Sequence, residues 1–167
     1  MRGPFPFIIA FAWVALSACD PPGPCDSPSP STSAALVVGE GVPGRDFKAL
    51  DAHVPYALVM GEQGLAMLDG LALKATGMVP QALGRTREGW SMRASFATGG
   101  EEIALVRSPH MVRDSGDGTG FEVVGIRVIP DPPPLKVWDQ DIEIRAEAVG
   151  LCGNEASATL VLRASRP

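Results

Sequence analysis

The amino-acid sequence predicts an all-β, antiparallel sandwich, and three observations support this fold class. Short apolar runs alternate with turn residues along the chain, and Gly and Pro number 19 and 16 among 167 residues. Alternation of apolar and polar residues within such runs is typical of half-buried strands. Seven or more runs at short spacing favour a sandwich or a small barrel over a helical fold.

The predicted strands cover residues 35–38, 56–60, 91–97, 102–106, 121–129, 141–149 and 156–162. Alternation is clearest in residues 141–149, where Ile142, Ile144, Ala146 and Ala148 share one face. Charged side chains occupy the positions between them. We therefore expect one face of this strand to lie in the core.

Residues 63–76 fit two structures, because their leucines recur at both helical and strand spacing. Gly64 and Gly70 disfavour a helix, since an interior Gly costs a helix about 1 kcal/mol. We expect a turn at residues 61–64 and a strand over residues 71–75. A short helix is the alternative.

The N-terminal segment has the organisation of a secretory leader. Arg2 is the only charged residue before Asp20, and residues 5–16 form an apolar run interrupted only by Pro6. A short positive region followed by such a run is typical of a signal peptide. The run is too short to span a bilayer, which needs roughly 20 apolar residues.

The leader ends in Leu16-Ser17-Ala18-Cys19. This order resembles the lipobox of bacterial lipoproteins, in which a leucine and two small residues directly precede a cysteine. The resemblance implies cleavage before Cys19, diacylglycerol on its sulfur and acylation of its new amino group. Two or more acyl chains anchor a protein stably, at about 0.8 kcal/mol per buried CH₂. An ordinary signal peptide cleaved near Ala18 is the alternative.

The expected domain organisation is a lipoprotein signal peptide over residues 1–18, a lipidated cysteine and tether over residues 19–33, and a β-sandwich domain over residues 34–167. Residues 20–33 hold five prolines and four serines but no large apolar side chain. Such a stretch cannot bury enough surface to offset the entropy of ordering it. We expect a disordered, extended spacer of about 3.1 Å per residue.

The last predicted hairpin spans residues 146–162, with Gly150 and Gly153 in its turn. Glycine supplies the backbone angles that a tight turn requires. This hairpin resembles the closing hairpin of immunoglobulin-like sandwiches, and the resemblance implies that architecture for the whole domain. The Cys-Trp-Cys core of that family is absent, because Trp138 precedes the strand and no pair of cysteines lies inside the domain.

Three cysteines are present. If Cys19 carries lipid, Cys25 and Cys152 remain, in an envelope compartment that favours disulfides. We expect a disulfide between Cys25 and Cys152, which would join the tether to the last hairpin. Two free thiols are the alternative.

A soft metal such as Cu(I) prefers thioether and imidazole ligands. The candidate ligands are His53, Met60, Met67, His110 and Met111. These residues lack the tight spacing of a metal motif, and methionine in apolar strands usually fills the core. Residues 114–120 also lack the oxygen ligands of an EF-hand at the required positions, and we expect a Gly-rich hairpin tip there.

No motif for nucleophilic catalysis or phosphate binding occurs, so we expect neither enzymatic activity nor a cofactor. The net charge of −5 argues against nucleic acid as a partner. We expect a lipid-anchored protein of the bacterial cell envelope whose domain has a binding or structural role. Its partners would be the membrane, through the lipid, and an envelope protein; the choice between inner and outer membrane stays open.

Two alternative functions remain at this point. One is an envelope protein that binds a small molecule or copper through the methionine and histidine set. The other is an enzyme whose active site assembles from residues far apart in the chain.

Overall fold

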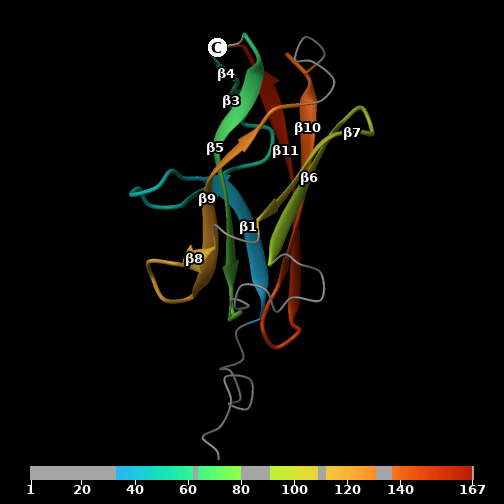
Figure 1. The fold of residues 1–167 in the computed structure, drawn as a ribbon. Coiled ribbons are helices and arrows are strands. Elements are labelled where there is room, and N and C mark those ends of the chain that lie inside the picture. Colours follow the sequence, from blue (N-terminus) through green and yellow to red (C-terminus); the bar gives the residue numbers. More distant parts are fainter. Residues whose placement is uncertain (1–32, 62–63, 80–90, 109–111, 131–136, 167) are drawn as a thin grey trace, which may run out of the picture.

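Eleven β-strands form two sheets in the described part of the chain (Figure 1). The computed structural model describes residues 33–61, 64–79, 91–108, 112–130 and 137–166. The first sheet has the order β2 (Lys48–Ala49), β1 (Ala35–Glu40), β5 (Ala66–Thr76), β9 (Gly120–Val128) and β8 (Arg113–Asp114), and β4 (Val59–Met60) also pairs with β5. The second sheet has the order β3 (Pro55–Ala57), β11 (Glu155–Ser165), β10 (Asp141–Val149), β6 (Met92–Thr98) and β7 (Glu101–Ser108). No helix occurs in these ranges, so the all-β prediction is confirmed.

The two sheets enclose a single apolar core, as expected for a β-sandwich. Leu73 and Val123 contribute to it from the first sheet, and Phe96 and Ile144 contribute from the second. Phe96 is 1% exposed and Val123 is fully buried. Burial of apolar surface between the layers is the main stabilising term of such a fold, at about 25 cal/mol per Å².

Strand β10 has the bounds and the faces that its alternation predicts. Ile142, Ile144, Ala146 and Ala148 are each at most 1% exposed, whereas Arg145 faces solvent. The strand lies in the middle of the second sheet, between β11 and β6. Its apolar face therefore meets the opposite sheet along its whole length.

The predicted strand over residues 56–60 is in fact two strands in different sheets. Leu58, which is fully buried, separates β3 of the second sheet from β4 of the first. Strand β3 runs parallel to β11, so the purely antiparallel prediction is wrong at this pair. The Tyr56 hydroxyl donates a hydrogen bond of 2.7 Å to the backbone oxygen of Asp69 and so joins the two sheets.

Residues 66–76 form one long strand, so the helical alternative for residues 63–76 is wrong. The Gly64 amide bonds to the Gly61 carbonyl oxygen at 2.9 Å, which confirms the predicted turn before this strand. The strand extends further than expected because Gly70, with φ of 80°, forms a β-bulge instead of ending it. A bulge accommodates one extra residue without breaking the ladder.

Candidate functional site

Of the predicted site residues, Cys19, Cys25, His110 and Met111 lie outside the described residues. Cys152 lies in the turn between β10 and β11 and is exposed. This turn is tied to the segment that follows β5, because the Leu151 amide bonds to the Val79 carbonyl oxygen at 2.8 Å. It closes the end of the sandwich at which β1 begins (Figure 1).

The described metal-ligand candidates do not converge. Met60 and Met67 occupy neighbouring strands but oppose different partners, Ala66 and Val59, so their side chains point to opposite faces. His53 lies in a turn beside β11 of the second sheet, where its amide bonds to the Val161 carbonyl oxygen. Among the described residues, no group of three or more His, Cys, Asp or Glu side chains could hold a metal ion.

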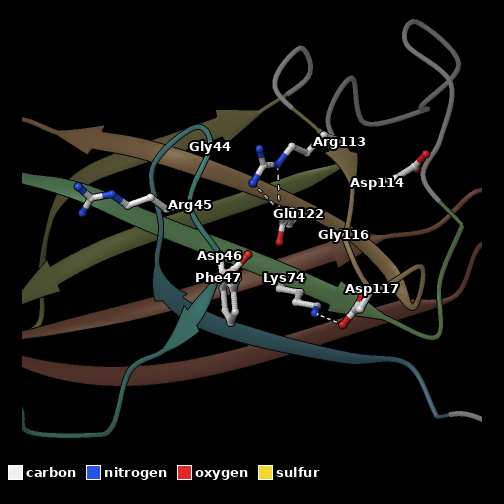
Figure 2. Close-up of a pocket in the computed structure, with 10 residues that line it drawn as sticks. All are labelled: Gly44, Arg45, Asp46, Phe47, Lys74, Arg113, Asp114, Gly116, Asp117 and Glu122. Atoms are coloured by element: carbon white, nitrogen blue, oxygen red, sulfur yellow. Dashed lines mark hydrogen bonds and ion pairs between the residues drawn. The ribbon is translucent and has the colours of Figure 1, made fainter.

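A charged pocket of about 600 Å³ lies on the outer face of the first sheet, the face turned away from the core (Figure 2). Three segments build it: the loop between β1 and β2, strand β5, and the hairpin of β8 and β9. We call it the outer-face pocket. It is lined by Gly44, Arg45, Asp46, Phe47, Lys74, Arg113, Asp114, Gly116, Asp117 and Glu122.

The register of the sheet sets the floor of the outer-face pocket. Glu122 of β9 is opposite Lys74 of β5 on one side and opposite Arg113 of β8 on the other. Directly opposed residues of antiparallel strands project from the same face. Cation, carboxylate and cation therefore form a row across three strands.

Glu122 is the buried charge of this row, with a side chain only 6% exposed. The Arg113 guanidinium contacts a single oxygen of its carboxylate: Nε donates to Oε1 at 2.9 Å, and Nη2 lies 2.7 Å from the same atom. A buried charge without a partner is strongly unfavourable, so this ion pair explains how Glu122 is tolerated.

Asp117 forms the rim of the pocket at the tip of the β8–β9 hairpin, which confirms the turn expected there. Its Oδ1 accepts hydrogen bonds from the Ser115 hydroxyl and from both the amide and the hydroxyl of Thr119. Its Oδ2 accepts a hydrogen bond from Lys74 Nζ at 2.5 Å. The Lys74 bond, followed by those from Thr119 and Ser115, lowers the pKa of Asp117 well below its usual range.

The loop between β1 and β2 forms the opposite wall. Its Phe47 ring packs over Gly39, where a Cβ atom would lie 2.5 Å from Cζ of the ring. Only glycine therefore allows the ring this position. The Lys74 ammonium lies 5.9 Å from the centroid of the same ring, within the range of a cation–π contact.

A second polar groove, of about 550 Å³, lies on the second sheet. Its main charged contact is the pair between Arg93 and Glu147, at 2.6 Å. Both side chains are over a third exposed, so solvent weakens the pair. It lacks a buried charge comparable to Glu122.

The outer-face pocket is suited to binding a charged group. Its lining residues offer three cations and four carboxylates, and none of them is Ser, Cys or His. Lys74 and Arg113 are already engaged in ion pairs. Asp46 forms no ion pair with any described residue, so its carboxylate is available to a ligand, whereas the carboxylate of Asp114 points away from Glu122 and Lys74 (Figure 2).

Sequence reasoning missed this pocket because its residues meet only through strand register. The available signal was the pair of charged residues, Glu122 and Arg127, inside the β-branched run 121–129. Charges in such a run indicate a strand with one face that is not part of the core. Its partners could not be named without the order of the strands.

Comparisons with protein-family models, with curated proteins and with solved structures gave no match for this chain. The described residues include no helix with the length and apolar character needed to cross a membrane.

Proposed function

We propose that this chain is a lipid-anchored protein of the bacterial cell envelope whose β-sandwich binds a partner and performs no catalysis. The observation that carries the anchor is the order Leu16-Ser17-Ala18-Cys19 directly after an apolar run of secretory length. The lipid on Cys19 would hold the protein at the membrane, and residues 20–33 would act as the spacer.

The arrangement of the sandwich supports this proposal. Its first strand, β1, begins at Ala35, so the ordered sheet starts directly after the proposed tether. Because the tether joins the sandwich at one end, the side faces of the domain stay open to a partner. The outer-face pocket lies on such a side face, with charged groups around an open cavity.

We further propose that the sandwich is of the immunoglobulin-like type. Immunoglobulin-like domains order their strands A-B-E-D in one sheet and C-F-G in the other. The run β1-β5-β9-β8 of the first sheet and the run β6-β10-β11 of the second follow that order along the chain. No described pair of cysteines supplies the central disulfide of antibody domains, so apolar packing replaces it here.

A disulfide between Cys25 and Cys152 is part of the proposal. Ala35 of β1 is opposite Thr76 of β5, and Asn154 Nδ2 donates to the backbone oxygen of Gly77 at 3.2 Å. The start of β1 and the turn that holds Cys152 are therefore close. The segment from Cys25 to Ala35 can span up to roughly 33 Å, so it is long enough to reach that turn.

Fractionation of cells that express variants with one cysteine replaced tests the anchor. The wild-type chain should sediment with membranes, and Cys19→Ala should appear in the soluble fraction. Cys25→Ala is the matched control, because it removes a cysteine from the same segment but leaves the lipid attached. Retention of Cys19→Ala in the membrane would refute the proposal.

A further inference from the structure

We infer that the outer-face pocket binds a primary ammonium group on an aliphatic stem, with Glu122 Oε2 as the principal acceptor and Asp46 as a second carboxylate. This inference rests on the proposed binding role of the domain. It does not depend on the lipid anchor.

Glu122 presents an unused acceptor to the cavity. Both contacting nitrogens of Arg113 lie on Oε1, and no described residue donates a hydrogen bond to Oε2. The side chain is 6% exposed, and the residue lines the pocket. Because the side chain is largely removed from water while Oε2 lacks a donor, the complementary ligand is one that brings an N–H donor to this oxygen.

The charges around Glu122 favour a cation over an anion. Lys74 is engaged by Asp117, and Arg113 by Glu122 itself. The guanidinium of Arg45 points away from Glu122 and Lys74, whereas Asp46 lies on their side of the loop (Figure 2). An entering ligand therefore meets the unpaired carboxylate of Asp46 and the free oxygen of the Glu122 carboxylate, and a positive group complements both.

The geometry at Glu122 selects an ammonium over a guanidinium. A guanidinium binds a carboxylate best through two parallel hydrogen bonds to its two oxygens. Arg113 already occupies Oε1, so a second guanidinium could not form that pair with Glu122. An ammonium needs only one oxygen and can direct its other donors to Asp46.

Phe47 accounts for the aliphatic stem. Its ring forms the wall of the cavity beside Lys74. Alkyl chains that carry an ammonium bury their methylene groups against apolar surfaces and keep the charge at a polar site. Free alkylamines and lysine side chains of a partner protein share this chemistry.

Titration of the mature full-length protein in detergent micelles, followed by backbone amide resonances, tests the inference. The probes are n-pentylammonium and the peptide acetyl-Ala-Lys-Ala-amide. The matched neutral probes are 1-pentanol and the same peptide with norleucine in place of lysine. We expect saturable shifts at Gly44, Phe47 and Gly116 with the charged probes and none with the neutral ones.

Substitutions in the pocket should weaken binding selectively. Glu122→Gln should raise the dissociation constant about tenfold or more, because it removes a charge-assisted hydrogen bond. Asp46→Asn, at an exposed residue without an ion pair, should weaken binding without disturbing the fold. Glu147→Gln is the matched control, since it alters a glutamate paired with an arginine on the other sheet.

The two probes distinguish the sources of the ammonium group. Tighter binding of the lysine peptide indicates a side chain of a protein partner, and tighter binding of pentylammonium indicates a free amine. Equal shifts with charged and neutral probes would overturn the inference. It would also be overturned if Asp46→Asn and a folded Glu122→Gln variant both bound the charged probes as tightly as the wild type. Such a result would leave the proposed membrane attachment through Cys19 untouched, so the proposed anchor and the inferred ammonium site can be refuted independently.

Discussion

Gly70 in β5 and Gly125 in β9 compensate each other. The first adds one residue to its strand and the second adds one to the neighbouring strand, so the register shifted at one bulge is restored at the other. The backbone of Gly41 joins them: its amide donates to the Gly70 oxygen at 2.9 Å, and its carbonyl accepts from the Gly125 amide at 2.8 Å. This clamp holds the loop that carries Phe47 against the outer face of the first sheet.

Replacement of Gly125 by alanine should loosen the clamp. Gly125 has φ of 69°, a conformation that costs an L-residue about 1–2 kcal/mol. A Cβ atom there would also lie 3.3 Å from Cδ of Pro43. We expect Gly125→Ala to lower the free energy of unfolding by about 1–2 kcal/mol, measured by urea denaturation.

Gly116→Ala is the control for this prediction. Gly116 does not have positive φ, and a Cβ atom there would have no neighbour within 4 Å. Its unfolding free energy should stay close to that of the wild type. Equal stability of both alanine variants would contradict the role given to the bulge.

Tyr56 should ionise at unusually high pH. Burial, followed by repulsion from Glu40 and Asp69, raises the pKa of Tyr56 from 10.0 to about 12. It is the only tyrosine of the chain, so absorbance near 295 nm reports it alone. Because the folded pKa exceeds the unfolded one, its contribution to stability is complete below pH 10 and is lost as the pH rises towards 12.

Tyr56→Phe should reduce the loss of unfolding free energy between pH 10 and pH 12, and it should destabilise the domain at neutral pH. The variant lacks the hydrogen bond to the Asp69 backbone oxygen, which contributes about 1 kcal/mol. A tyrosine transition near pH 10 in the folded protein would show that the ring is solvated and would contradict this packing.

Acid should remove the contribution of Asp117. The hydrogen bond from Lys74 is the largest cause that lowers the pKa of Asp117 below its usual 3.8. A carboxyl group with a lowered folded pKa stabilises the fold above its unfolded pKa and loses that effect as the pH falls below it. We expect Lys74→Met and Asp117→Asn to lose less stability than the wild type between about pH 4 and pH 2. If the urea midpoint of unfolding fell by the same amount in all three proteins over that pH range, the pairing of Lys74 with Asp117 would be contradicted.

The proposed disulfide predicts a single cross-linked peptide pair. Digestion without reductant should yield Cys25 joined to Cys152, and reduction should separate them. A bond that closes so long a loop contributes about 4–5 kcal/mol when stabilisation is attributed to chain entropy. Two thiols that react with an alkylating reagent in the folded, unreduced protein would contradict this pairing.

The sequence is sufficient for those elements whose signal is local. Alternation in residues 141–149 predicts β10 with its faces, because one side of that strand meets the core along its length. The turn residues around Asp117 predict the hairpin between β8 and β9. Both depend on neighbours within a few residues.

Features that depend on which strands pair, and in which register, cannot be predicted from local sequence patterns. Gly70 favours the end of a strand locally, yet the compensating bulge at Gly125 lets β5 continue. The division of residues 56–60 between two sheets depends on the burial of Leu58. Likewise, Lys74 and Glu122 become neighbours only through the register of β5 and β9, which no local pattern specifies.

The mass of the mature N-terminal peptide tests the central claim most directly. Residues 19–45 contain no Lys or Arg before Arg45, so trypsin should release them as one peptide after reduction. From cells that process lipoproteins, this peptide should begin at Cys19 and carry diacylglycerol and an amide-linked acyl chain. A peptide that begins at another residue, or one that begins at Cys19 without lipid, would contradict the account.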